Sequence, residues 1–89
     1  GKDYTKYGKI LQTIEDGGDL KAAAKEYFDH GTEKGDIGSA ITAEYKPKYI
    51  AASPAERKKL KEKLLAAYAA LGFDRNKKSK DVDKWLEES

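Results

Sequence analysis

Apolar residues recur along most of the chain at spacings of three and four, which is the period of an amphipathic α-helix. The first such stretch places Tyr4, Tyr7, Ile10, Leu11 and Ile14 on one stripe. Together with glycine, capping and proline positions, the pattern predicts helices over residues 4–16, 19–30, 33–45, 54–71 and 80–88. No alternation of period two continues for more than a few residues. We therefore expect one all-α domain over residues 1–89, a compact bundle of four to five short helices with orthogonal or mixed packing.

Several helix ends carry clear local signals. Gly17 can take the left-handed backbone conformation that ends a helix. Asp19 is suited to cap the second helix, because its carboxylate can accept hydrogen bonds from unpaired amides of the first turn. Ser53, Pro54 and Glu56 have the spacing of a capping box with proline at the first helical position. These signals fix the starts of the second and fourth helices.

The third helix has weaker signals. Thr32 is the expected N-cap, but Gly35 and Gly38 each cost about 1 kcal/mol relative to alanine in a helix. If these glycines face a neighbour, they permit a close approach between helices. Pro47 disfavours helical geometry at Lys46, so we expect this helix to end or bend there.

The stretch "EYKPKYIAASPAER" allows two interpretations. Its alternating tyrosines and lysines could grip nucleic acid. It is more simply a tight corner between the third and fourth helices, in which Tyr45 and Tyr49 pack inward while Lys46 and Lys48 stay in solvent. We favour the corner.

The segment "FDRNKKSKD" is expected to be a polar link that leads into the last helix. That helix begins at Ser79 or Lys80 in this interpretation. Its buried side consists of Val82, Trp85 and Leu86, and two of these side chains are large enough to dock the helix firmly.

Composition narrows the classes of protein. The 89 residues include no cysteine and one histidine, the net charge is +2, and 38% of the residues are charged. Disulfides and thiolate sites are therefore excluded. The apolar runs are shorter than the roughly 20 residues that cross a bilayer, and no signal peptide is visible. We expect no membrane association and a cytoplasmic or virion-associated location.

No arrangement of residues points to catalysis. His30 beside Asp29 could be a general base oriented by a carboxylate, but a cation at a helix C-terminus explains it more simply. The glycines of "GDIGSA" follow no strand and lack the lysine of a phosphate-binding loop. Neither zinc nor calcium spacing occurs. We predict that the chain is not an enzyme and uses no cofactor or metal.

Nucleic-acid binding is the alternative function. A helix-turn-helix around Gly31 is disfavoured by Tyr27, by His30 and by an acidic third helix that phosphates would repel. Two basic clusters, "RKKLKEK" and "RNKKSK", are better candidates. The phosphate-binding candidates are Arg57, Lys58, Lys61, Arg75, Lys77, Lys78 and Lys80. A solvated helix face and a polar link explain the same residues without any ligand.

Six tyrosines and one tryptophan are many for a core of this size. Rings with one polar tip suit surfaces that a partner covers. The partner-binding candidates are Tyr4, Tyr7, Tyr49 and Trp85. A position in the core is the favoured interpretation for each of them.

The C-terminal half resembles a known kind of sequence. "ITAEYKPKYIAASPAERKKLKEKLLAAYAALGFDRNKKSKDVDKWLEE", residues 41–88, resembles a helical segment of large phage and prophage proteins. The resemblance implies a module of a virion-associated or phage-encoded protein, and it brings no catalytic residue. The absence of cysteine and methionine and the alanine-rich helices would also suit an engineered derivative of such a module.

The sequence therefore predicts a small, non-enzymatic helical protein-interaction module or binding scaffold. Its partner is expected to be another protein. The alternative is a nucleic-acid-binding domain that uses the two basic clusters.

Overall fold

The computed structural model describes residues 4–88, and these residues form five α-helices and no β-strand. The helices are α1 (Gly8–Asp16), α2 (Leu20–Asp29), α3 (Lys34–Ala51), α4 (Pro54–Ala70) and α5 (Arg75–Glu88), and a short 3-10 turn, η1 (Thr5–Tyr7), precedes α1. The predicted all-α fold class is confirmed.

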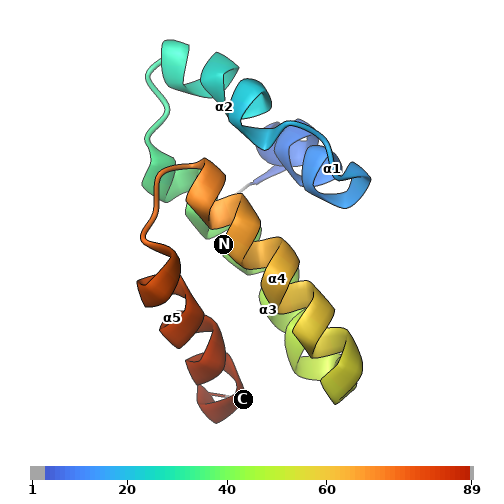
Figure 1. Ribbon diagram of the computed structural model, residues 1–89. Helices are drawn as coiled ribbons and strands as arrows, with labels where there is room; N and C mark the ends of the chain where they lie inside the picture. The colour runs from blue at the N-terminus through green and yellow to red at the C-terminus, as the bar shows by residue number, and fades with distance from the viewer. Residues whose placement is uncertain (1–3, 89) are drawn as a thin grey trace.

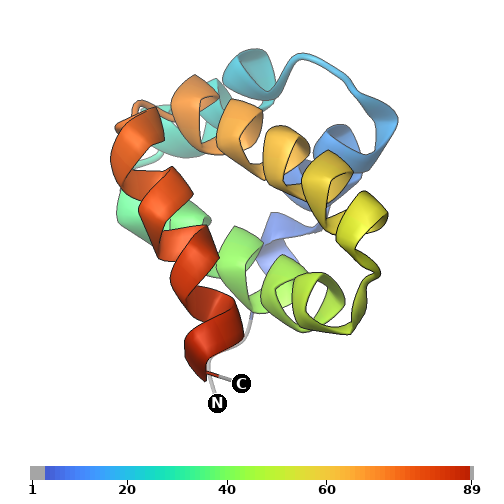
Figure 2. The ribbon, with the colours of Figure 1, turned by 60° about the horizontal axis from the view of Figure 1, so that its bottom comes forward.

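The helices form two groups (Figure 1). In the first group, α4 packs against both α3 and α5, and α5 also contacts α3. In the second group, α1 and α2 pair with each other across one end of the first group (Figures 1 and 2). The chain reverses between α3 and α4 and again between α4 and α5, so α4 runs antiparallel to both neighbours.

The core is the common inner side of both groups. Its largest fully buried side chains are Tyr45, Tyr68, Ile10, Ile37, Ile41, Leu64 and Val82. The buried tyrosine hydroxyls have partners, because Tyr68 shares a hydrogen bond of 2.6 Å with Thr42 Oγ1 and Tyr45 donates to Glu15. Among the described residues, no buried side-chain polar atom lacks a hydrogen bond. The aromatic residues therefore enter the core without leaving an unpaired polar group.

The local helix signals are confirmed where they were strongest. Gly17 has φ 68° at the end of α1. The Asp19 carboxylate accepts a hydrogen bond from Ala22 N at 3.1 Å, and Ser53 Oγ accepts one from Glu56 N at 3.3 Å. Both caps satisfy backbone donors that have no partner inside their helices.

The expected end of the third helix is wrong. α3 continues through Pro47 to Ala51, so the stretch after Tyr45 is helix and not a corner. Proline inside a helix costs about 3 kcal/mol, but Tyr45 and Tyr49 are both buried one turn apart on the inner side. Burying two aromatic side chains outweighs that cost. The inward direction of both tyrosines is confirmed.

The expected start of the last helix is also wrong. α5 begins at Arg75, because the carboxylate of Asp74 accepts hydrogen bonds from Asn76 N at 2.8 Å and Lys77 N at 3.1 Å. Most of the supposed polar link is thus the first turns of a capped helix. Val82 and Trp85 are buried as expected, but Leu86 is 37% exposed.

Two expectations about the start of α3 need correction. Glu33, not Thr32, precedes the first helical residue, and it makes no side-chain cap. Gly35 has no atom near its missing side chain, so it is not a packing device. Gly38 is one, because a Cβ atom at this position would lie 2.9 Å from Cζ of Phe73.

Candidate functional site

An apolar groove of about 910 Å³ lies between α2 and α4. Most of its lining is apolar. The lining residues are Asp19, Lys21, Ala22, Lys25, Phe28, Ala66, Ala69, Ala70, Leu71 and Gly72. We call this surface the α2–α4 groove.

The wall from α2 follows from helical spacing. Lys21, Lys25 and Phe28 are separated by four and three residues, so they lie on one stripe of the helix. Leu20 and Ala24 occupy the neighbouring inner face and are buried. Phe28 was expected on the apolar side of this helix, but its side chain lies at the edge of that side and is 37% exposed.

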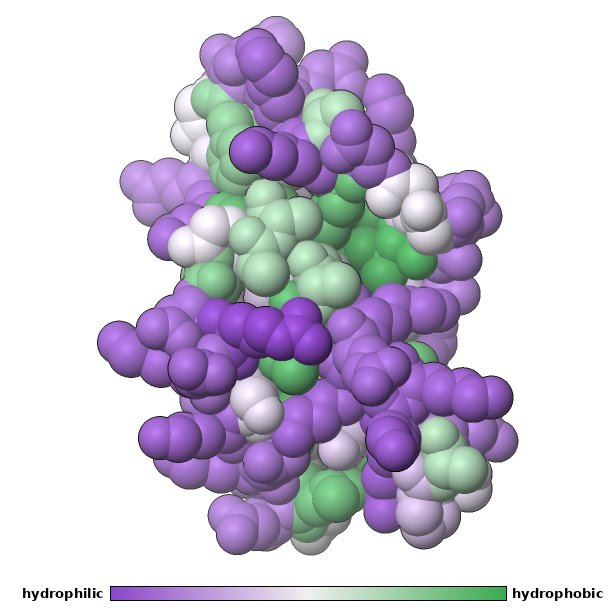
Figure 3. Space-filling view, in the orientation of Figure 1, coloured by the Kyte–Doolittle hydropathy of each residue, from purple (hydrophilic) through white to green (hydrophobic). Residues whose placement is uncertain are grey.

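The wall from α4 consists of alanines. Ala66 and Ala69 are exposed and Ala70 is half-buried, while Leu64 and Tyr68 of the same helix point into the core. In Figure 3, apolar surface gathers over the C-terminal half of α4, and hydrophilic surface covers most of the lower part of this face. Small side chains leave the backbone of α4 close to the surface, so a partner can approach it closely.

A second hollow of about 300 Å³ adjoins the groove. It shares Asp19, Ala66 and Ala70 with the groove, and Ile14, Leu20 and Lys63 are among its other lining residues. The two hollows together form an apolar band that crosses from α2 over α4 toward the end of α1.

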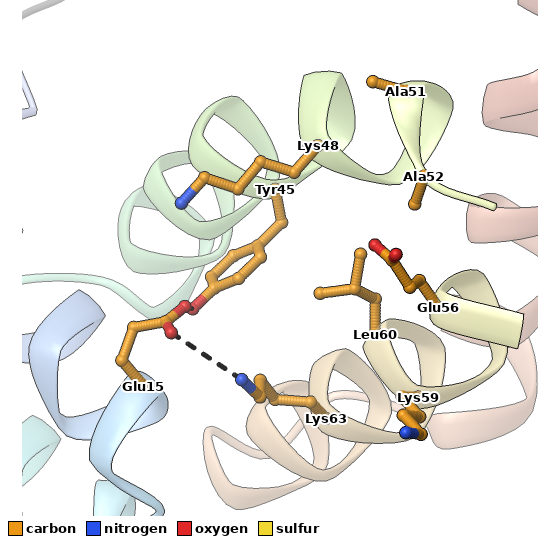
Figure 4. Close-up of a pocket in the computed structure, with 9 residues that line it drawn as sticks. All are labelled: Glu15, Tyr45, Lys48, Ala51, Ala52, Glu56, Lys59, Leu60 and Lys63. Carbon is orange, nitrogen blue, oxygen red and sulfur yellow. Dashed lines mark hydrogen bonds and ion pairs between the residues drawn. The ribbon is translucent and has the colours of Figure 1, made fainter.

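A third hollow, of about 570 Å³, is a polar cleft where α1, α3 and α4 meet (Figure 4). The Tyr45 hydroxyl points at the carboxylate of Glu15 and donates a hydrogen bond to it. Lys63 Nζ lies 3.7 Å from the same carboxylate, and Lys59 extends away from it. The Glu15 carboxylate thus links α1 to α3 and to α4.

These contacts shift two pKa values in opposite directions. The hydrogen bond from Tyr45 is the main cause that lowers the pKa of Glu15 below 4.5, and the positive charge of Lys63 adds to it. Burial, reinforced by the Glu15 carboxylate, raises the pKa of Tyr45 well above its ordinary value. The pair is therefore held as carboxylate and phenol. We interpret it as a structural link, since its polar groups already serve one another.

His30 lies in a shallow hollow of about 390 Å³ with Lys9, Glu26, Tyr27 and Thr32. The Nδ1 atom of His30 is 2.8 Å from the carbonyl oxygen of Glu26, so this nitrogen is the donor. The carboxylate of Asp29 pairs with Lys25 at 2.8 Å instead. The Tyr27 hydroxyl donates a hydrogen bond to the carbonyl oxygen of Lys6. Asp29 therefore does not orient the His30 ring, and the hypothesis of a general base at His30 is not supported.

The partner-binding candidates lie mostly in the core. Tyr7, Tyr49 and Trp85 are 3%, 5% and 6% exposed. Tyr49 and Trp85 meet edge to face with ring centroids 5.7 Å apart. The partner-binding role of these three rings is not supported, because a ring buried in the core offers no surface to a partner. Tyr4 is half-buried and packs against the core, with its ring 6.3 Å from that of Tyr7.

Three of the phosphate-binding candidates have structural contacts. Arg57 donates to the carbonyls of Tyr49 and Ile50 at 3.1 and 2.9 Å, which caps the end of α3. Lys61 pairs with Asp83 at 2.7 Å. Lys78 lies over the rings of Tyr68 and Phe73, 4.7 and 4.5 Å from their centroids. The remaining candidates, Lys58, Arg75, Lys77 and Lys80, are exposed.

The two basic clusters lie at neighbouring levels of the α4–α5 pair, and structural contacts engage a lysine in each of them. Because α4 and α5 are antiparallel, Lys61 lies beside Asp83 near the end of α5, and Lys78 lies beside Tyr68 near the end of α4. These two contacts are five residues apart on α5 and seven residues apart on α4, which is roughly 10 Å along the pair. Asp83 of α5 stands beside the first cluster and pairs with Lys61.

The described residues contain no group of three or more histidine, cysteine, aspartate or glutamate side chains that could hold a metal ion. Within residues 4–88, none of the helices combines the length and the apolar character needed to span a bilayer. In the comparisons with known proteins, no family model, curated protein or solved structure matches the chain.

The groove was not foreseen from the sequence. The alanines of "LKAAAKEYF" and "LLAAYAALGF" indicate good helix formers, and this pattern does not tell which of them stay uncovered. The spacing of Lys21, Lys25 and Phe28 was the available signal. It places an aromatic residue on a basic stripe instead of on the core side.

Proposed function

We propose that the chain is a non-enzymatic protein-interaction module that binds its partner in the α2–α4 groove. The observation that supports this function is the apolar lining of the groove, with Phe28 and three alanines reaching its surface. Apolar surface that is gathered in one place and bordered by charged residues is typical of protein-binding sites. The polar cleft and the His30 hollow are supported less well, because Glu15, Tyr45 and Lys63 contact one another in the first and Lys9 pairs with Glu26 in the second.

A binder selection tests this function. Helical peptides displayed as a library are selected on the immobilised chain, and each enriched peptide is measured by fluorescence anisotropy against two variants. Ala69→Arg places a long cationic side chain in the groove at an exposed helical position. Ala43→Arg makes the same change at an exposed position of α3 outside the described hollows.

We expect enriched peptides that bind the chain with micromolar affinity or better. Ala69→Arg should weaken them at least about tenfold, which corresponds to about 1.4 kcal/mol, and Ala43→Arg should leave them unchanged. A library that yields no binder, or binders equally sensitive to both variants, contradicts the proposed function. Circular dichroism of both variants establishes that each stays folded.

The alternative hypothesis of nucleic-acid binding is tested in parallel with labelled DNA and RNA. We expect little binding even at low salt, because Arg57, Lys61 and Lys78 are engaged in structural contacts and Asp83 places a negative charge beside the first cluster. Binding that falls steeply with salt and disappears in the double variant Lys77→Glu/Lys80→Glu would favour the alternative instead. A role within a larger phage-type protein stays a hypothesis that rests on the sequence resemblance. A role as an engineered scaffold stays a hypothesis that rests on the composition.

A further inference from the structure

The rim of the α2–α4 groove is predominantly basic. Lys21 and Lys25 line it from α2. Lys63 borders the adjoining hollow, where its Nζ atom lies 3.7 Å from the Glu15 carboxylate. Asp19 is the acidic residue at the rim, and its carboxylate already accepts the hydrogen bond from Ala22 N. Lys25 pairs with Asp29, but the two side chains are 73% and 57% exposed. Such an exposed pair is weak and exchanges readily with another anion.

From this arrangement we infer that the occupant of the groove is an amphipathic α-helix whose apolar stripe is flanked by aspartate or glutamate. This inference rests on the proposed function and adds the chemistry of the partner. The apolar stripe covers Phe28 and the alanines of α4, while the acidic flank meets the ammonium groups of Lys21 and Lys25. The lysine stems are apolar and extend the walls of the groove.

The secondary structure of the occupant follows from its backbone. An extended peptide exposes amide and carbonyl groups that need hydrogen-bond partners. The alanine wall of α4 offers none, since its backbone groups are bonded inside the helix. The described residues contain no sheet edge that could pair with a strand. A helix satisfies its own backbone, so it can lie on an apolar wall without an unpaired group.

The small side chains of α4 also suit a helix. Ala66, Ala69 and Ala70 let the axis of a third helix come close to α4, and Phe28 lines the groove from α2. α2 is ten residues long, about 15 Å. A partner helix of about three turns, roughly 10 residues, matches this length, and roughly 14 residues span it with about half a turn beyond each end.

A second copy of the chain fits less well. Pairing two grooves across a two-fold axis brings the lysine rims of both copies together, and like charges oppose association. Basic helices are disfavoured for the same reason. The sign of the rim charge thus selects among occupants that share an apolar stripe.

Two defined peptides test the inference. Both have about 14 residues and the same leucine and alanine stripe, and both carry a hydrocarbon staple on the outward face because short free helices are marginal in water. One has glutamate at every flanking position and the other has lysine. Circular dichroism establishes equal helicity. Binding is measured by fluorescence anisotropy at low and moderate salt.

We expect the glutamate peptide to bind about tenfold more tightly than the lysine peptide at low salt, and the difference to shrink as salt rises. The double variant Lys21→Glu/Lys25→Glu should reverse the preference. The control Lys77→Glu/Lys80→Glu makes the same change of net charge on α5, outside the groove, and should preserve the preference.

Failure of the inference and failure of the proposed function give different results. Equal binding of both peptides, or tighter binding of the lysine peptide, overturns the acidic helix while leaving the groove as a binding site. A preference that the α5 control reverses as strongly as the α2 variant also overturns it. If library peptides bind at the groove but the glutamate peptide does not, the partner class is wrong. If no peptide binds there, the proposed function fails as well.

Discussion

Phe73 fills the space that Gly38 leaves open on α3. The Phe73 ring is fixed on its other sides by Tyr68, which meets it edge to face at 5.9 Å, and by Lys34 and Lys78, whose ammonium groups lie 5.1 and 4.5 Å from its centroid. Lys34 also donates to the carbonyl of Gly72 at 3.0 Å. The four-residue link between α4 and α5, residues 71–74, is thus anchored on α3.

Gly38→Ala tests this anchor. Alanine improves helix propensity by about 1 kcal/mol, but its Cβ atom would lie 2.9 Å from a ring that is held on several sides. We expect a net loss of about 1–2 kcal/mol in the free energy of unfolding, measured by urea denaturation. Gly35→Ala is the matched control, because nothing lies within 4 Å of the added atom. It should stabilise the protein by about 0.5 kcal/mol, and equal effects of the two changes would contradict the anchor.

Arg57 is predicted to stabilise the protein instead of binding phosphate. Arg57→Ala removes both hydrogen bonds to the last turn of α3. We expect a loss of about 1–3 kcal/mol in the free energy of unfolding, since charged donors make the stronger hydrogen bonds. Lys58→Ala, at the exposed neighbouring position, should change stability by less than about 0.5 kcal/mol. A neutral effect of Arg57→Ala in denaturation would show that the cap is dispensable.

The Glu15–Tyr45 pair predicts how stability depends on pH. The pKa of Glu15 is lowered in the folded state, so its contribution is complete above the ordinary value of 4.5 and is lost as the pH falls through the folded value. Glu15→Gln and Tyr45→Phe should each flatten the decrease of the free energy of unfolding on the acid side. Glu62→Gln is the control at an exposed position of α4. A wild-type slope in both variants would exclude the pair as a source of the acid dependence.

The same pair acts in the opposite direction at high pH. The pKa of Tyr45 is raised in the folded state, so its contribution is present below the ordinary value of 10.0 and is lost as the pH rises toward the folded value. We expect Tyr45→Phe to lessen the fall in the free energy of unfolding above about pH 10. Burial raises the pKa of Tyr68 as well. A titration followed by tyrosinate absorbance should therefore show one late-ionising tyrosine fewer in Tyr45→Phe than in the wild type.

The fold could be predicted from the sequence as far as its signals are local. The stripes of α1 and α4, the Asp19 and Ser53 caps and the left-handed Gly17 all depend on residues within a few positions of one another. The start of α5 had a local signal too, because Asp74 precedes it as a good cap. The basic first turns of α5 resemble a polar link, and this resemblance hides the cap at Asp74.

The end of α3 could not be predicted in this way. Pro47 acts locally against the helix, while the groups that favour it lie elsewhere in the chain. Trp85 of α5 covers Tyr49, and Arg57 of α4 bonds the last carbonyls of α3. The α2–α4 groove could not be predicted for the same reason. Which alanines stay uncovered depends on how α2 packs beside α4, and local sequence does not encode that packing.

Chemical-shift mapping measures whether a partner docks between α2 and α4. The backbone amide signals of the ¹⁵N-labelled chain are followed while a library-selected peptide is added. We predict that the large shifts fall in residues 19–28 and 66–72, and that the outer face of α5 around Lys77, Lys80 and Lys84 stays unchanged. Shifts centred on α5 or on the polar cleft around Glu15, with the groove signals unmoved, would contradict the account.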